Sequence, residues 1–179
     1  MIPLSLLHPA PADRVRQSPN HSARPGTVRA VACVVLHATA DGGNEEAAEK
    51  WMCNRGAMVS AHLHVRRDGT VVRLVPDLRR AWHAGISAWK GRRDVNDFSL
   101  GWELANRNDG VEPYTAAQYA AVARLAVHYI RQGMRPEAFV SHAEIALPDG
   151  RKTDPRGFDW ARFLSDVQRA LHATPAGNR

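Results

Sequence analysis

Two histidines and one aspartate are the residues of this 179-residue chain whose types suggest a metal site: His37, His142 and Asp154. Both histidines come at the end of apolar runs, and the aspartate lies in a polar loop. Two imidazole nitrogens and a carboxylate oxygen suit Zn²⁺, and a catalytic zinc site leaves its fourth position open for water. Because the three residues are remote in sequence, spacing alone leaves both a metal site and three unrelated polar residues open.

The segments that must position these residues alternate between strand and helix patterns. The β-branched run 31–36 predicts a buried central strand that ends at His37. Further strands are predicted at 98–104 and 139–140, and a hairpin at 60–66 and 70–75 around the turn Asp68-Gly69. The stretch 79–97 has no clear period and is expected to be an ordered surface loop.

Three helices carry cap signals at their starts. Asn44 predicts a helix over about 45–54, with Ala48, Trp51 and Met52 facing inward. Thr115 and Gln118 form a capping box for a helix to about residue 132, and Asp159 caps the last helix.

The fold class is therefore expected to be α/β (α+β), a single domain with a central mixed sheet flanked by helices. We expect an N-terminal arm over 1–30, the catalytic domain over 31–172 and a flexible tail over 173–179.

Composition limits the classes of partner. The net charge of +6 and the pI near 10.0 favour an anionic partner, but the arginines are scattered and no nucleic-acid-binding motif is present, so we expect no nucleic acid. Without a long apolar stretch or a secretion signal, we expect no membrane insertion, a cytoplasmic location and a monomer. Two cysteines are too few for a disulfide framework, and Cys33 is expected in the core.

Several short motifs occur in order along most of the chain. They are Val34-Val35-Leu36-His37, Ser60-Ala61-His62, Arg66-Arg67-Asp68-Gly69, Ala81-Trp82-His83-Ala84-Gly85, Asn96-Asp97-Phe98-Ser99-Leu100-Gly101-Trp102-Glu103-Leu104, Ser141-His142 and Gly150-Arg151-Lys152-Thr153-Asp154-Pro155. Together they resemble the zinc-dependent N-acetylmuramoyl-L-alanine amidase family, over about residues 18–164. The resemblance implies hydrolysis of the amide between N-acetylmuramic acid and L-alanine in peptidoglycan or muropeptides, and the fold of peptidoglycan recognition proteins.

The resemblance also implies roles for individual residues. His37, His142 and Asp154 match the ligands of one zinc ion per chain, which would polarise the carbonyl and acidify a water. Glu103 matches the catalytic glutamate that takes the proton of the water, and Lys152 matches a donor that faces the oxyanion.

Residues near the expected groove are harder to assign. His83 and Trp82 belong to a motif that borders the substrate groove in the family, and Asn96 could line the groove or fix a turn. Strand alternation, with Ala61 taken to face the metal, points His62 and His64 away from it, so we assign both histidines to packing or hydrogen bonding.

Two biological roles and one other class stay open. The short stretch between His37 and His62, and Asp94 where the recycling branch has an arginine, favour a phage or prophage endolysin slightly over a wall-recycling enzyme. An endolysin would reach the wall only on release. A non-catalytic peptidoglycan-binding module is the alternative, although Asp154, Glu103 and Lys152 are all present.

Overall fold

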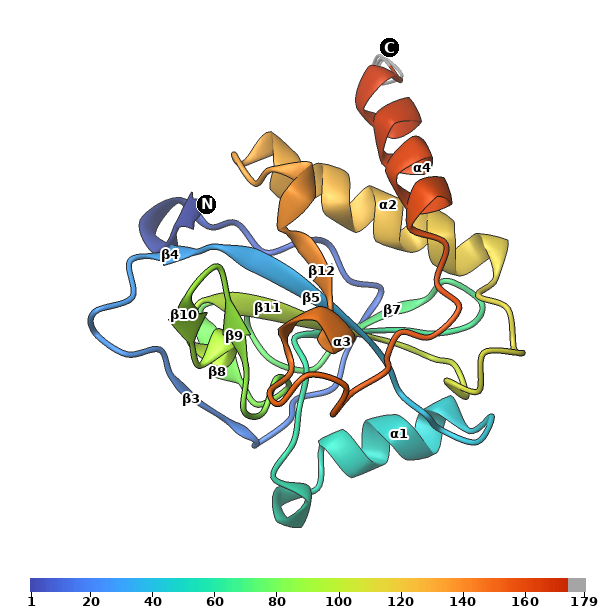
Figure 1. Ribbon diagram of the computed structural model, residues 1–179, viewed down its shortest axis with the longest axis horizontal. Helices are drawn as coiled ribbons and strands as arrows, with labels where there is room; N and C mark the ends of the chain where they lie inside the picture. The colour runs from blue at the N-terminus through green and yellow to red at the C-terminus, as the bar shows by residue number, and fades with distance from the viewer. Residues whose placement is uncertain (174–179) are drawn as a thin grey trace.

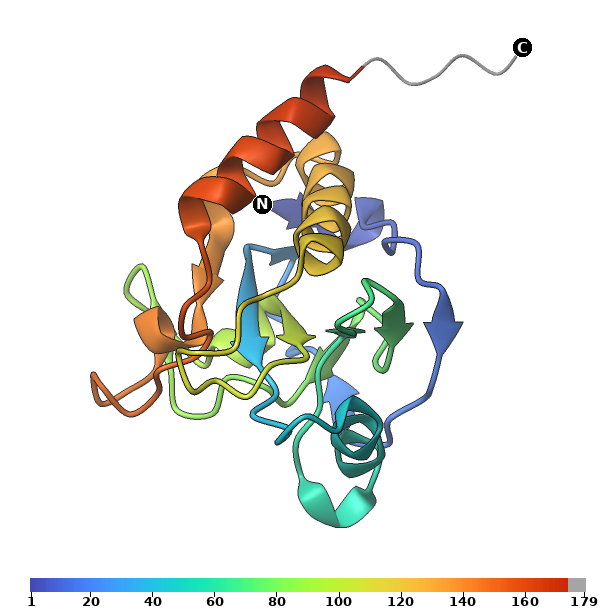
Figure 2. The ribbon, with the colours of Figure 1, turned by 90° about the vertical axis from the view of Figure 1, so that its right-hand side faces the viewer.

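A mixed sheet of six strands organises the molecule, seen in a computed structural model that describes residues 1–173 (Figures 1 and 2). In spatial order its strands are β12 (Phe139–Ser141), β5 (Cys33–Ala38), β11 (Ser99–Leu104), β6 (Leu63–Val65), β7 (Val71–Arg73) and β2 (Arg14–Val15). The strands β12, β5, β11 and β6 run parallel, and β7 returns antiparallel to β6 as the predicted hairpin. The predicted mixed sheet is confirmed.

Helices cover both faces of the sheet. The helices α2 (Ala116–Arg131) and α4 (Trp160–His172) pack against each other on one side, and α1 (Glu45–Met52) lies on the opposite side (Figure 2). All three predicted caps are confirmed, because Asn44, Thr115 and Asp159 each accept a hydrogen bond from a backbone N–H of the first turn. Local sequence therefore set where these helices begin.

Helix α1 differs from the prediction in one side chain. Met52 is buried, but Trp51 is 58% exposed and the prediction that it faces inward is wrong. The buried residues of this short helix are Glu49 and Met52 instead. The carboxylate of Glu49 is turned inward because it forms hydrogen bonds with His64 and Arg66. A buried acidic residue breaks the apolar pattern on which the prediction depended.

The stretch 79–97 contains more regular structure than predicted. It forms β8 (Arg79–Ala81), β9 (Ala88–Trp89), β10 (Arg92–Arg93) and a 3₁₀ helix, η3 (Val95–Asp97). Strands of two or three residues are too short to produce a readable alternation, so the sequence pattern missed them.

The N-terminal segment predicted as an arm is extended and packs onto the domain. β1 (Ile2–Pro3) pairs with β4 (Ala30–Val31), β3 (His21–Ala23) pairs with β8, and β2 extends the central sheet beside β7. The side chain of Ile2 is fully buried. Of the predicted tail 173–179, only Ala173 lies within the described residues.

The prediction that Cys33 lies in the core is confirmed. Cys33 is buried, Cys53 is half-buried, and both cysteines are free thiols. No helix within residues 1–173 has the length and apolar character needed to cross a bilayer. The short helices η1 (Leu4–Leu6), η2 (Arg55–Ala57), η4 (Pro136–Ala138) and α3 (His142–Ile145) complete the fold.

Candidate metal centre

Two neighbouring parallel strands bring the first two predicted ligands together. His37 lies near the carboxyl end of β5, and His142 directly follows β12 as the first residue of α3. Because parallel strands end at the same edge of a sheet, both imidazoles reach one place. The loop with Asp154 is held against α3, since the amide of Ala143 donates to the Asp154 carbonyl at 3.0 Å.

The three side chains converge closely. His37 Nδ1 lies 3.0 Å from His142 Nδ1, and Asp154 Oδ2 lies 3.0 Å from the His142 nitrogen and 3.3 Å from the His37 nitrogen. All three residues are buried, with exposed fractions of 1%, 5% and 7% for His37, His142 and Asp154. The ligand atoms therefore form a compact group that could hold one metal ion.

The electrostatics of this group fit a cation. Burial lowers the pKa of His37 to about 4 despite the nearby carboxylate, so the imidazole is neutral and offers a lone pair. Although burial opposes it, hydrogen bonding to both histidines holds the pKa of Asp154 well below its usual value. Two imidazoles and one carboxylate are a donor set that Zn²⁺ accepts.

His83 supports the first ligand from behind. Its Nδ1 lies 3.0 Å from His37 Nε2, and its Nε2 lies 3.1 Å from Ser99 Oγ, which donates to the Val95 carbonyl at 2.6 Å. The ring packs over Gly101, where a Cβ would overlap it. This row of hydrogen bonds fixes which nitrogen of His37 faces the metal group.

Asn96 holds the turn that carries His83. Its side-chain oxygen accepts hydrogen bonds from the amides of His83 and Ala84 at 3.0 and 2.8 Å. The structure therefore gives Asn96 the turn-fixing contact, one of the two roles open from the sequence.

Glu103 lies on the strand next to the first ligand. β11 pairs with β5 so that Glu103 is the direct neighbour of His37. Burial raises the pKa of this carboxyl to about 8, with a further contribution from Asp154. Within residues 1–173 its Oε2 is buried without a hydrogen-bond partner, so the carboxylate is not consumed by structural contacts.

A cavity of about 610 Å³ opens onto this group. His37, His142, Asp154, Glu103, His83, Lys152 and Trp82 all line it. Trp51 and Val59 add an apolar wall, and both side chains are substantially exposed. Lys152 is exposed and its charge acts on both His37 and Glu103.

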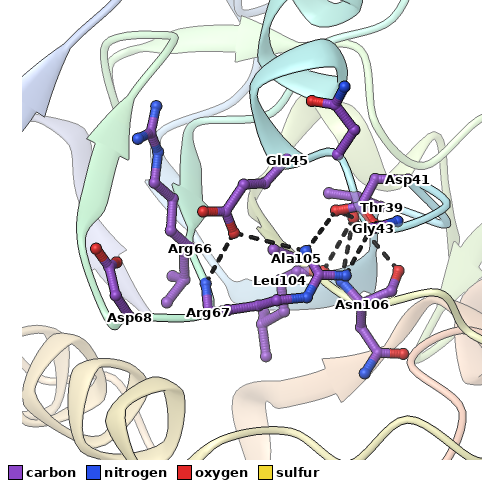
Figure 3. Close-up of polar contacts among 12 residues, drawn as sticks. Thr39, Asp41, Gly43, Glu45, Arg66, Arg67, Asp68, Leu104, Ala105 and Asn106 are labelled. Carbon is purple, nitrogen blue, oxygen red and sulfur yellow. Dashed lines mark hydrogen bonds and ion pairs between the residues drawn. The ribbon is translucent and has the colours of Figure 1, made fainter.

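An ion-pair network fixes one rim of the cavity. Arg67 makes two hydrogen bonds to Asp41, at 2.9 and 3.1 Å, and its backbone amide donates to Glu45 at 3.0 Å (Figure 3). Asp41 also accepts from Thr39 and from the amide of Gly43. The loop after β5 is therefore held in place at the edge of the site.

His64 differs in orientation from the prediction. It is paired in register with Glu103, so it lies on the sheet face that carries the metal group, whereas His62 precedes β6. Hydrogen bonding nevertheless occupies them, because His62 contacts the Arg79 carbonyl and His64 contacts Glu49. Glu49 was not identified from sequence, where a glutamate on a short helix resembles an ordinary solvated residue.

Comparison with known sequences identifies relatives of the chain. A family model described as N-acetylmuramoyl-L-alanine amidase matches residues 27–157. The 1,6-anhydro-N-acetylmuramyl-L-alanine amidase AmpD of Citrobacter freundii is 45% identical over 116 residues, 64% of this chain and 60% of the relative. That of Escherichia coli K12 is 48% identical over 112 residues, 59% of this chain and 56% of the relative.

Solved structures agree with these relatives. A crystal structure of a selenomethionine AmpD derivative has a TM-score of 0.70 and 33% identity, covering 93% of this chain and 99% of that one. AmiD from E. coli, solved with anhydro-N-acetylmuramic acid-L-Ala-D-gamma-Glu-L-Lys, has a TM-score of 0.68 and 34% identity, covering 79% and 59%. A mutant endolysin from Bacillus subtilis, with a TM-score of 0.60, 21% identity and coverage of 86% and 97%, shares the fold.

Proposed function

The chain belongs to the N-acetylmuramoyl-L-alanine amidase family, and on that premise we propose that it hydrolyses the amide between N-acetylmuramic acid and L-alanine. The observation that carries the proposal is the convergence of three buried ligand atoms beside Glu103 in one open cavity. An enzyme that cuts a stable amide needs a carbonyl activator and a proton acceptor at one place, and these residues supply the positions for both.

We propose that His37, His142 and Asp154 hold one Zn²⁺ per chain. The donor set of two imidazoles and one carboxylate, its burial and its spacing support this metal. When bound there, Zn²⁺ supplies Lewis-acid polarisation of the scissile carbonyl and lowers the pKa of water to about 7. Asp154 brings one negative charge, which balances part of the charge of the ion.

Glu103 is the proposed proton carrier. It accepts a proton from the attacking water and returns that proton to the alanine nitrogen as the carbon–nitrogen bond breaks. Its position beside His37 and the raised pKa of its carboxyl, about 8, support a group that can both accept and release a proton near neutral pH. Positioned acid–base groups of this kind contribute about 10²- to 10⁴-fold to rate.

Lys152 and the aromatic wall are the proposed substrate contacts. The exposed ammonium of Lys152 lines the cavity and would face the oxyanion of the tetrahedral intermediate. Trp82, on the same lining, is suited to pack against the sugar or the stem peptide. His83 and Asn96 act on the substrate groove indirectly, through the turn and the ligand that they support.

A soluble anhydro-muropeptide is the proposed substrate. The relatives with 45% and 48% identity carry the name 1,6-anhydro-N-acetylmuramyl-L-alanine amidase, whereas the endolysin likeness at 21% identity concerns the fold. The slight preference for an endolysin drawn from sequence features therefore gives way to a recycling role.

The test is to supply purified, zinc-loaded protein with anhydro-muropeptide and with intact sacculi side by side. Mass spectrometry should find released alanine-headed peptides, and faster from the soluble substrate. Glu103→Ala should keep the metal and lose at least about 100-fold in kcat. Muropeptide binding without any turnover by the zinc-loaded protein would instead make the chain a binding module.

A further inference from the structure

Behind Glu103 lies a buried pair of residues that the proposed mechanism does not use, His64 and Glu49. We propose that His64, anchored by Glu49, is a positioning residue for Glu103: a small side-chain rotation or one bridging water links its Nε2 to the buried Oε2 of Glu103, and this link turns the other oxygen into the cavity. The proposal rests on the proposed function of Glu103 as proton carrier.

Strand register places the three residues in one row. β11 lies between β5 and β6, and its Glu103 is paired with His37 on one side and with His64 on the other. Residues paired directly across neighbouring strands project from the same face of a sheet. His64 is therefore the neighbour of Glu103 on the side away from the metal group.

Each of these two paired residues carries a polar atom that lacks a partner among the described residues. Within residues 1–173, Glu103 Oε2 and His64 Nε2 are both buried and make no hydrogen bond. Buried polar atoms are nearly always paired, so two such atoms on adjacent residues call for a common explanation. Neighbouring strands are about 4.8 Å apart, so the two side chains leave from adjacent backbone positions. A side-chain rotation or one bridging water can join polar ends at that range.

The two oxygens of Glu103 differ in surroundings. Glu103 lines the cavity and is half-buried, but only Oε2 is a fully buried atom without a partner. Since neither oxygen is hydrogen-bonded within the described residues, Oε1 is the one that the cavity reaches. A donor or acceptor on Oε2 would thus set the angle at which Oε1 meets a water.

The far side of His64 is firmly held. His64 Nδ1 lies 3.0 Å from Glu49 Oε1, and Arg66 binds both oxygens of that carboxylate, at 2.7 and 2.9 Å. Glu49 and His64 are 1% and 0% exposed. A carboxylate paired with arginine accepts hydrogen bonds, so Nδ1 of His64 is the donor and the ring cannot turn over without losing that bond.

An imidazole nitrogen and a carboxyl oxygen can form a hydrogen bond with each other or with a shared water. Such a link would complete a row from Glu49 through His64 to Glu103, which ends at the cavity.

Two isosteric substitutions separate positioning from packing. His64→Gln keeps an amide nitrogen near the place of Nε2 and loses the contact with Glu49, whereas His64→Asn keeps one near the place of Nδ1 and loses Nε2. With zinc loaded in both, we expect kcat to fall about tenfold in His64→Asn and less than about threefold in His64→Gln, with KM unchanged. A purely structural His64 gives the opposite order or equal losses, and either result overturns the proposal.

A second measurement reads the link without turnover. In zinc-loaded protein with ¹⁵N-labelled histidine, the His64 Nε2 resonance should move by several parts per million in Glu103→Ala and stay in place in Val59→Ala, a matched change in the same cavity lining. An unmoved resonance overturns the link. If wild-type protein cleaves no muropeptide but the resonance moves, the proposed function fails and the link stands.

Discussion

The two faces of the central sheet are built from the same strands, but one face packs into the core and the other carries the candidate metal site. On the side of α2 and α4, Trp102 of β11 packs against Tyr129 and Phe139 with ring centroids 5.9 and 5.7 Å apart. On the side of α1, the next residue of the strand is Glu103, flanked by His37 and His64. The first face is closed and mainly apolar, with Trp102 Nε1 as a buried polar atom, whereas the second carries the buried atoms Glu103 Oε2 and His64 Nε2. Within residues 1–173 none of these three atoms has a hydrogen-bond partner.

The difference shows how a small domain can hold a site whose buried polar groups lower its stability. Because successive residues of a strand point to opposite faces, the aromatic side stabilises the backbone that holds the polar side in register. Unsatisfied buried groups weaken the fold, and they persist where the rest of the structure determines their position. Substitutions on the polar face should therefore lower metal binding or activity, whereas substitutions on the apolar face should lower the free energy of unfolding.

The largest effect is expected from removing a ligand on the polar face. His142→Ala should abolish measurable hydrolysis and zinc binding, because one of three metal donors is lost. The apolar face is untouched, so the circular dichroism spectrum of the fold should stay that of the wild-type apoprotein. Metal analysis and circular dichroism measure the two outcomes, and a variant with one zinc and full activity would contradict the ligand assignment.

Next in size is damage to the apolar face. Trp102 is fully buried, and Trp102→Ala should lower the free energy of unfolding by about 3–5 kcal/mol through lost burial and a residual cavity. Urea denaturation of the apoprotein measures this loss. A change below about 1 kcal/mol would show that the α2 side does not carry the stability of the sheet.

A smaller effect is expected for the residue behind the first ligand. His83→Ala should weaken zinc binding by about 10- to 100-fold, because the row from His37 to Ser99 is broken. The urea midpoint of the apoprotein should move much less than in Trp102→Ala. Zinc affinity equal to that of the wild type, measured by chelator competition, would assign His83 to packing alone.

The contacts of Glu49 with His64 and Arg66 should make the stability of the protein depend on pH. Although burial opposes it, hydrogen bonds from His64 and Arg66 lower the pKa of Glu49 from 4.5 to about 2. The folded state then binds this proton less readily than the unfolded state, so the stabilisation is full above pH 4.5 and is lost as the pH falls towards 2. The free energies of unfolding of wild type and Glu49→Gln, measured as a function of pH, should differ most above pH 4.5 and approach each other below it. A difference that does not change with pH would contradict this.

The smallest effect is expected at the rim of the cavity. Trp51→Ala removes an exposed apolar side chain, so KM for muropeptide should rise a few-fold while kcat, zinc content and stability stay unchanged. Leu78→Ala, an exposed apolar residue outside the cavity lining, is the matched control. Equal KM values for the two variants would remove Trp51 from the substrate surface.

Local patterns in the sequence were sufficient for much of the fold. The caps at Asn44, Thr115 and Asp159 could be predicted because a capping hydrogen bond spans only two or three residues. The hairpin around Asp68 and Gly69 follows from turn chemistry in the same way. The two-residue strands β9 and β10 could not be predicted, since nothing so short shows a period.

By itself, the sequence determined which residues have the chemistry of a metal site, because His37, His142, Asp154 and Glu103 lie in recognisable motifs. Only the tertiary structure decided how these residues meet and what stands behind them. The contacts of His83 with His37 and of His64 with Glu49, and the register between His64 and Glu103, join separate elements of the chain. Such contacts depend on how strands and helices pack, and no local pattern of residues encodes that geometry.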